Sequence, residues 1–358
     1  MRSRLHATLS WLHLWFGLVA GTLFALVGLS GSVLVFHDDL LRMQHPQLEG
    51  HAPVADGEVL AGILARWAPE GLGSLHLPEP EGSGLPVWQG YFADGHRAYF
   101  APEDGALLLE RHVASDPLLF LTDFHIHLLG GETGHQWLGV IGWIGLGLLL
   151  SGLYLWWPRF GTWRNHLKLH TGPPVRRWLT WHRSTGLFLL PLLLLSTLTG
   201  LGMVYHAGFR NVLTGVFGGG DAPSAPVLAT ARDTVPDWPS ILATANAALP
   251  DARLTRTGPA EPGSDVIGFR ARPARSTYTR LRPLGCHSPA ARAGRQVLLA
   301  HDATRQGYGA RLTEAIYPVH IASVGGGWFR WLTFLGGLVP AFLLVTGFLF
   351  WRRRRGKR

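Results

Sequence analysis

The sequence is poor in cysteine and lacks several motifs that carry common chemistry. Its 358 residues include a single cysteine, Cys286, so no intrachain disulfide, thiolate zinc site or cysteine-held iron–sulfur cluster can form. No GxGxxG motif follows a strand-like run, which removes the usual sign of a nicotinamide-binding domain. The chemistry must therefore come from other residues.

Four long apolar runs stand out, at residues 11–36, 137–157, 186–205 and 331–351. Each has about 20 residues or more, enough to cross ~30 Å of hydrocarbon. None contains Asp or Glu, so the intramembrane carboxylates typical of proton and ion pathways are missing, which disfavours a transporter. A cleaved signal peptide is the alternative for the first run, but its length and the lack of a small-residue cleavage pattern favour a retained helix. We expect four transmembrane helices.

Positive charge is concentrated beside these runs. Arg2 and Arg4, the segment 159–178 and the tail 351–358 are rich in Arg and Lys. The positive-inside rule places all three in the cytoplasm, with both termini inside and the two long connections outside. The net charge of +9 is thus explained by topology. We expect contact with membrane lipid and no nucleic-acid partner, because the short basic tail has no folded reader beside it.

Spans one and three share one register. In each, a histidine is followed by glycines 4 and 18 residues later and by a second histidine 24 residues later. These residues are His13, Gly17, Gly31 and His37 in the first span and His182, Gly186, Gly200 and His206 in the third.

Spans two and four share a second register. They align at Gly152 and Gly347, and 27 residues before each glycine stands a histidine, His125 or His320. The sequence thus contains a unit of helix, external segment and helix twice, and the repeat is parallel because both copies start inside.

The external segments predict α+β structure. Segments 57–71 and 239–252 each read as a short amphipathic helix, and Asp94-Gly95 between two alternating runs predicts a hairpin. Segment 102–105 predicts a further turn, and 266–273 and 296–309 occupy the corresponding places in the second copy. We expect two small α+β domains outside the membrane.

The predicted fold class is therefore a membrane α-helical protein, in which four transmembrane helices form two parallel helix–domain–helix repeats. The spans are 1–37, 135–158, 182–206 and 328–351, the external domains are 38–134 and 207–327, the cytoplasmic loop is 159–181, and the basic tail is 352–358.

Six motifs, in order, resemble the PepSY-associated transmembrane family. They are WLHLWFGLVAG with LSGSVLVFHDDL, FHIHLLGGETG, SGLYLWWPR, WHRSTGLF with LTG, YPVHIASVGG and TGFLFWRRRR. The resemblance implies a bacterial inner-membrane protein of iron metabolism whose external domains resemble PepSY domains. It also implies kinship with haem-containing reductases that pass electrons outward to ferric siderophores in the periplasm.

The family pattern carries over onto four histidines, which we expect to bind two haems in pairs. A parallel repeat would bring His13 and His182 to equal depth on facing helices, where imidazoles can hold one iron from both sides. An isolated membrane histidine more often bonds to a backbone carbonyl or lies among headgroups; the repeat favours ligation here. Gly17 and Gly186, one turn away, would either let helices approach or leave room for a flat macrocycle.

The outer site has two candidate pairs. His125 and His320 precede glycine-rich breaks that could fold them over the bundle mouth, and the family motif favours them. The alternative is His37 with His206, which could instead line the substrate vestibule or stabilise haem propionates. His127 lies outside the matched motif.

The predicted function is an oxidoreductase that conducts electrons through two b-type haems to a ferric siderophore or another ferric chelate in the periplasm. A CxxCH motif is absent, so covalent c-type attachment is excluded. The electron donor is a quinol, a flavin or a soluble reductase. The alternative is a non-enzymatic membrane protein that binds a peptide, a peptidase or a regulatory partner. Zinc is disfavoured because paired histidines do not supply three or four converging ligands.

Overall fold

A computed structural model describes residues 2–80, 84–157, 167–219, 236–248, 250–259, 266–273, 290, 291, 297 and 306–355. Cys286 and residues 159–166 of the expected cytoplasmic loop lie outside these residues. The chain divides into two compact units. The helical unit comprises Met1–Phe36, Leu121–Gly208 and Val319–Arg358, and the sheet unit comprises His37–Phe120 and Phe209–Pro318.

Three helices of the described chain are long and apolar enough to cross a membrane. They are α1 (Arg2–Leu34), α5 (Gly131–Trp156) and α12 (Gly326–Arg355). They coincide with the first, second and fourth apolar runs of the sequence. The membrane character predicted from those runs is therefore confirmed.

The third apolar run forms a bent pair of helices rather than the single helix that we expected over 182–206. Helices α7 (Pro174–Phe188) and α8 (Leu190–Val204) meet at 61°. Pro191 lies in the first turn of α8, where it lacks the N–H that would bond to Leu187 and its ring would crowd that carbonyl. Leu189 still donates to the carbonyl of Thr185 at 3.0 Å, which closes α7. The pair provides a fourth span if it is counted as one.

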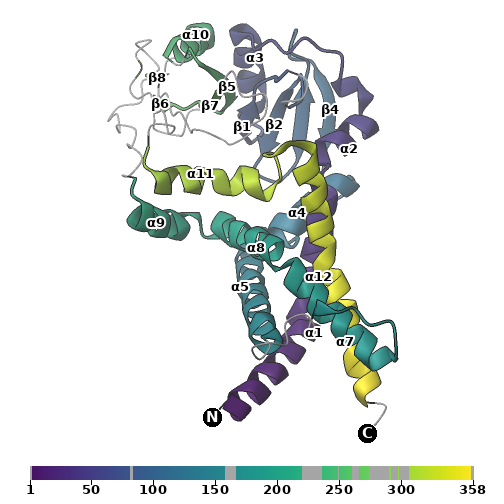
Figure 1. The fold of residues 1–358 in the computed structure, drawn as a ribbon. Helices are drawn as coiled ribbons and strands as arrows, with labels where there is room; N and C mark the ends of the chain where they lie inside the picture. Colours follow the sequence, from purple (N-terminus) through teal and green to yellow (C-terminus); the bar gives the residue numbers. More distant parts are fainter. Residues whose placement is uncertain are drawn as a thin grey trace. The chain divides into compact units, whose positions relative to one another are not determined.

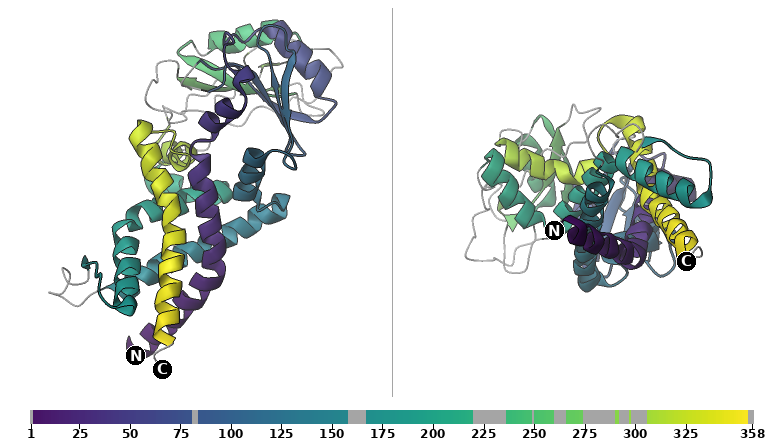
Figure 2. Two further views of the ribbon diagram at one scale, coloured as in Figure 1. Left: turned by 90° about the vertical axis from the view of Figure 1, so that its right-hand side faces the viewer. Right: turned by 60° about the horizontal axis from the view of Figure 1, so that its bottom comes forward.

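Helices α1 and α12 run side by side, with α5 against α1 and α7 against α12 (Figures 1 and 2). Glycine permits the closest approach: a Cβ added to Gly28 would lie 2.7 Å from the carbonyl oxygen of Gly337. One turn on, Oγ of Ser32 donates to the carbonyl of Phe334 at 2.8 Å. Small residues and interhelical hydrogen bonds stabilise contacts of this kind in lipid, where the hydrophobic effect does not act between helices.

Two short helices carry the histidines that precede the second and fourth spans. Helix α4 (Pro117–His127) contains His125, and α11 (Tyr308–His320) ends at His320. After α4 the backbone turns through left-handed conformations at Leu128 (φ 49°) and Leu129 (φ 61°), and after α11 it does so at Ala322 (φ 52°). Such conformations are strained for residues with a Cβ. The glycine-rich breaks expected after His125 and His320 are therefore sharp turns.

The sheet unit contains one antiparallel sheet of six strands, in the order β4-β3-β2-β1-β5-β7. The strands are β1 (Leu72–His76), β2 (Trp88–Phe92), β3 (Arg97–Phe100), β4 (Leu107–Arg111), β5 (Ala252–Thr257) and β7 (Arg270–Pro273). A second sheet pairs β6 (Val266–Ile267) with β8 (Ala290–Ala291). The remaining described elements are α2 (His37–Gln44), η1 (Pro46–Leu48), α3 (Gly57–Trp67), α9 (His206–Phe217) and α10 (Trp238–Ala248).

The local predictions for the external segments are largely confirmed. The two amphipathic helices are α3 and α10, and the hairpin is β2 with β3 in antiparallel register from Trp88↔Phe100 to Tyr91↔Arg97. Gly95 occupies the turn with φ 91°, a conformation that glycine adopts without strain. Most of segment 296–309 lies outside the described residues.

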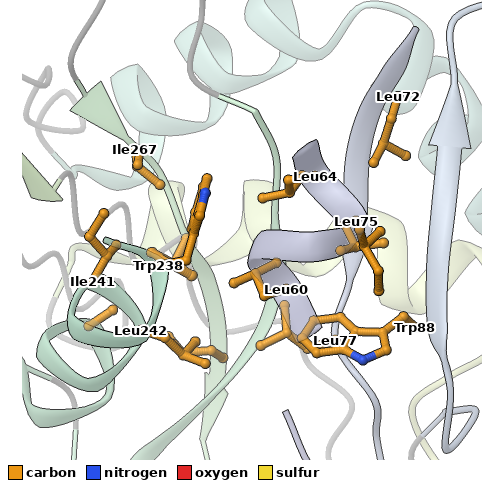
Figure 3. Close-up of a cluster of buried hydrophobic side chains, with 14 of the residues drawn as sticks. Leu60, Leu64, Leu72, Leu75, Leu77, Trp88, Trp238, Ile241, Leu242 and Ile267 are labelled. Carbon is orange, nitrogen blue, oxygen red and sulfur yellow. The ribbon is translucent and has the colours of Figure 1, made fainter. Parts of the chain in front are cut away.

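Most of the two segments expected as separate domains, His37–Phe120 and Phe209–Pro318, forms one compact unit. The remaining residues of the expected ranges, which include His125 and His320, belong to the helical unit. Strand β1 of the first segment pairs with β5 of the second, at Leu75↔Thr257 and His76↔Arg256. Side chains of both segments share one core, with Leu60 and Trp88 from the first and Trp238 and Ile241 from the second (Figure 3). Pairing with β5 covers an edge of β1 that would otherwise be exposed. Residues of α3 and α10, one helix from each segment, contribute to the one core.

Candidate functional site

The structure brings His13 and His182 together inside the helical unit. Their ring centroids lie 6.3 Å apart with the ring planes at 89°. His13 lies on α1 and His182 on α7, the two helices that share the first register. We call this arrangement the inner pair.

Each imidazole of the inner pair has its Nδ1 bonded to the helix that follows in its own copy. Nδ1 of His13 lies 2.9 Å from Oγ of Ser151 on α5. Nδ1 of His182 lies 2.9 Å from the carbonyl oxygen of Leu343 and 3.3 Å from Oγ1 of Thr346, both on α12. In both rings Nε2 is the nitrogen left for another partner.

A cavity of about 500 Å³ surrounds the inner pair. Its lining is mainly leucine and glycine, and it includes the two histidines together with Gly17 and Gly186. Basic groups also line it, namely His6, Arg183 and Arg354. Sites for small molecules and cofactors are commonly apolar hollows of this size with a few polar groups.

His125 and His320 form a second, outer pair in the helical unit. Their ring centroids lie 6.2 Å apart with the planes tilted by 35°. Nδ1 of His125 lies 2.9 Å from Oγ of Ser30 and 3.1 Å from the carbonyl oxygen of Val27. Nδ1 of His320 lies 3.0 Å from Oγ1 of Thr199. The two pairs therefore have the same pattern of partners.

A glycine lies beneath Cε1 of every histidine in the two pairs. A Cβ added to Gly31 would lie 2.8 Å from Cε1 of His125, and the other three distances are 3.2 to 3.3 Å. Those three contacts are Gly152 with His13, Gly347 with His182 and Gly200 with His320. A larger residue at these places would displace the rings.

Sequence reasoning missed the hydroxyl partners, although a signal for them was present. Each hydroxyl residue immediately precedes its ring-supporting glycine, so a Ser-Gly or Thr-Gly dipeptide occurs four times in the two registers. The dipeptides are Ser30-Gly31, Ser151-Gly152, Thr199-Gly200 and Thr346-Gly347. Where the dipeptide meets the histidine of the other register, the hydroxyl bonds to Nδ1 and the glycine makes room for the ring.

The other histidines named from the sequence have different surroundings. His37 begins α2 in the sheet unit, where its Nδ1 lies 3.0 Å from Oδ1 of Asp38. His206 is exposed at the start of α9. His127 belongs to neither pair. Its Nδ1 lies 2.8 Å from Oδ1 of Asp123, and its ring centroid lies 5.7 Å from that of His135.

The separation of the rings in each pair suits ligation of one metal ion by two imidazoles. Two metal–nitrogen bonds of ~2.0–2.1 Å, added to the short distance from each Nε2 to its ring centre, separate two ring centroids by about 6 Å. The observed separations are 6.3 and 6.2 Å. Among the described residues no group of three or more His, Cys, Asp or Glu side chains converges as a metal site.

Comparison with known proteins places these features in a family. A family model described as a PepSY-associated TM region matches residues 10–354, which include all four paired histidines. No curated protein is similar enough to the chain to count as a match.

Proposed function

The chain belongs to the PepSY-associated transmembrane family, and on that premise we propose that it is a haem-dependent oxidoreductase of the bacterial inner membrane. It conducts electrons across the membrane and reduces a ferric siderophore, or another ferric chelate, in the periplasm. The observation that carries the proposal is the presence of two histidine pairs with 6.3 and 6.2 Å between ring centroids.

The spacing of the two pairs along α1 suits transfer across a bilayer. His13 belongs to the inner pair, and Ser30 contacts the outer pair. The 17 residue steps from position 13 to position 30 correspond to roughly 25 Å of helix at 1.5 Å per residue. That length is most of the ~30 Å hydrocarbon thickness. The pairs would thus lie near opposite faces of the membrane.

The residues around the inner pair fit a haem. The cavity of about 500 Å³ is lined mainly by apolar groups, and two imidazole rings line it with their centroids 6.3 Å apart. His13 and His182 would hold one haem iron, and His125 and His320 would hold a second. Arg183 and Arg354 line the cavity where they could bond to carboxylates. A bound haem supplies the one-electron redox couple that the amino acids lack.

The side chains contribute by positioning the imidazoles and by providing an apolar environment around them. The leucine-rich lining excludes water from the inner pair, and the glycines beneath the rings let the imidazoles lie close to the helices. No general acid or nucleophile is needed, because the reaction adds one electron to Fe(III) and gives Fe(II). Fe(II) binds the hard oxygen ligands of a siderophore less well, so release follows.

Charge supports the direction of transfer. Arg352, Arg353 and Arg354 follow the fourth apolar run, and Arg2 and Arg4 precede the first. By the positive-inside rule this charge supports cytoplasmic ends and, with them, a periplasmic sheet unit. A haem held by the inner pair would then lie nearest a donor, which is a quinol, a flavin or a soluble reductase, and a haem held by the outer pair would lie nearest the chelate.

The first test is the optical spectrum of the purified chain with a pyridine haemochrome assay. We expect about two b-type haems per chain, both low-spin and six-coordinate, because each pair offers two imidazoles. A colourless preparation from haem-replete cells would contradict the proposal. It would leave the alternative of a non-enzymatic protein that binds a peptide, a peptidase or a regulatory partner.

The second test concerns direction. The protein is reduced in right-side-out and in inverted membrane vesicles, and each preparation is mixed with a membrane-impermeant ferric siderophore. We expect reoxidation only where the sheet unit faces the siderophore. Equal reoxidation from both faces would refute the transmembrane conduit, even if the haem content is as expected.

A further inference from the structure

We infer that Ser30, Ser151, Thr199 and Thr346 are positioning residues that hold the four paired histidines in one tautomer, with Nε2 free to bind iron. The inference rests on the proposed function for the identity of the metal group. The tautomer assignment rests on the hydrogen bonds alone.

The hydroxyl protons of the two serines are used within their own helices. Ser151 Oγ donates to the carbonyl of Leu148 at 3.1 Å, and Ser30 Oγ donates to the carbonyl of Val27 at 2.8 Å. Serine and threonine commonly bond to their own helix in this way. A hydroxyl has one proton and two lone pairs, so each oxygen that donates to its helix is left to accept from a histidine.

The same holds for the threonines of the second copy. Thr199 Oγ1 donates to the carbonyl of Leu195 at 2.7 Å, and Thr346 Oγ1 donates to the carbonyl of Phe342 at 2.8 Å. Each hydroxyl proton is therefore used within its own helix. The imidazole Nδ1 at each site must then carry the proton and donate it to the hydroxyl oxygen.

Backbone carbonyls lead independently to the same tautomer. A carbonyl oxygen only accepts, so the 2.9 Å contact of His182 Nδ1 with Leu343 and the 3.1 Å contact of His125 Nδ1 with Val27 require Nδ1–H. Two of the four rings are thus assigned twice, His13 is assigned by Ser151, and His320 is assigned by Thr199.

Hydrogen bonds from metal-binding histidines to nearby acceptors commonly orient the ring and tune its affinity for the metal. An Nδ1–H that donates to an acceptor fixes the ring orientation, leaves the lone pair on Nε2 and raises the basicity of the ligand. Loss of such a partner typically lowers metal affinity about 10- to 100-fold. Each hydroxyl also ties the histidine to another helix of its own copy, as Ser151 on α5 does for His13 on α1.

The four sites differ in how many acceptors each histidine has. In the part of the chain that the structure describes, Nδ1 of His13 has the hydroxyl of Ser151, whereas Nδ1 of His182 has both Thr346 and the carbonyl of Leu343. Removing the hydroxyl at Ser151 should therefore have a larger effect than removing it at Thr346.

The experiment compares Ser151→Ala with Ser151→Thr, Thr346→Val and the control Thr22→Val in the full-length chain. Thr22 is a matched control because it lies on α1 and bonds to its own helix at Leu18, yet it is exposed to the surroundings. The first readout is ¹⁵N NMR of histidine-labelled protein prepared without haem, which distinguishes Nδ1–H from Nε2–H. The second is the affinity for added haem, and the third is the ligation spectrum and midpoint potential of the loaded protein.

We expect Ser151→Ala to show a mixture of tautomers at His13 and to bind the inner haem about 10- to 100-fold more weakly. Ser151→Thr should restore both properties, Thr346→Val should have a smaller effect, and Thr22→Val should resemble the parent. A parent protein with His13 as Nε2–H would overturn the inference, and so would Ser151→Ala with unchanged tautomer and unchanged haem affinity. If the parent shows Nδ1–H but binds no haem, the proposed function fails while the tautomer assignment stands.

Discussion

The helical unit and the sheet unit treat the internal repeat in opposite ways. In the helical unit the two copies have equivalent contacts: His13 with Ser151 corresponds to His182 with Thr346, and each ring also has its glycine. In the sheet unit the first segment supplies four strands of the six-stranded sheet and the second supplies two. In this unit the two copies contribute unequal parts to one sheet and do not form equivalent structures.

The difference follows from what each unit must bury. A histidine pair needs one imidazole from each copy at the same depth, so a change in one copy spoils the site. A sheet needs a continuous core and paired edges, and these can be made from unequal contributions. Equivalence of the copies thus indicates the part of the molecule where two-sided chemistry is expected.

The largest expected effect is at the inner pair. His13→Ala and His182→Ala should each remove the same haem, about half of the total, because one iron needs both imidazoles for low-spin six-coordinate binding. Haemochrome assay and the reduced-minus-oxidised spectrum measure this. His127→Ala is the matched control and should keep both haems. Depletion of different haems by the two changes would show that the pairing is not functional.

The next effect tests whether the sheet unit is a single cooperative body. Trp238→Ala should destabilise the unit by about 3–5 kcal/mol, because it truncates a large side chain, 5% exposed, in the shared core. Hydrogen exchange at β2 and β3, which belong to the other segment, should become faster. The control Leu107→Ala alters a residue that is 46% exposed and should have little effect. Unchanged exchange in β2 and β3 would indicate that the segments fold independently.

A smaller effect concerns acid stability of the sheet unit. Burial raises the pKa of Asp116, but hydrogen bonds from Arg111 and from the backbone N–H of Leu119 lower the pKa more, and the net pKa is below its usual value. Arg111 contacts both carboxylate oxygens at 2.7 Å. Since the folded pKa is below the unfolded one, the pair contributes stability above about pH 4, and this is lost as pH falls through the folded pKa.

Asp116→Asn should therefore cost roughly 1.5–3 kcal/mol near neutral pH and flatten the acid dependence of stability. Urea unfolding of the solubilised chain at several pH values, read by hydrogen exchange of β3 and β4 peptides, measures both. The control Glu70→Gln removes an exposed pair with Arg66 and should change little. If the free energy of unfolding of Asp116→Asn fell at low pH as in the parent, the Asp116–Arg111 pair would not be the source of the acid sensitivity.

The smallest effect is expected at the alternative outer histidines. His37→Ala and His206→Ala should leave the outer haem spectrum intact, because His37 already bonds to Asp38 and His206 is exposed. His125→Ala and His320→Ala should remove that haem and slow reoxidation by a ferric chelate. Loss of the outer haem only in the His37 and His206 variants would transfer the ligand role to them.

Some features followed from local pattern. Apolar length predicted the helices that became α1, α5 and α12, and alternation around Asp94-Gly95 predicted the β2–β3 hairpin. The counted registers predicted that His13 would meet His182, and the family motif favoured His125 with His320 over the alternative of His37 with His206. Each of these features depends on residues close together in the sequence or on a spacing that repeats at a fixed period.

Other features depend on groups that are distant along the chain. The bend between α7 and α8 lies inside an apolar run that reads as one span, although Pro191 was a local clue. The pairing of β1 with β5 and the hydrogen bond between His13 and Ser151 link residues more than 100 positions apart. Periodicity and composition do not specify such partners, because they describe the burial of each segment and not the segment it is buried against.

The amino-acid pattern thus contained the membrane helices, the repeat and the inner pair of imidazoles, since hydrocarbon thickness and helix period act on each segment alone, and it left two candidates for the outer pair. Packing of the bundle selected which nitrogen of each imidazole is occupied and placed a hydroxyl at every one. Packing of the external segments made one sheet where the repeat suggested two domains. Both outcomes depend on the satisfaction of buried polar groups by partners from elsewhere in the fold.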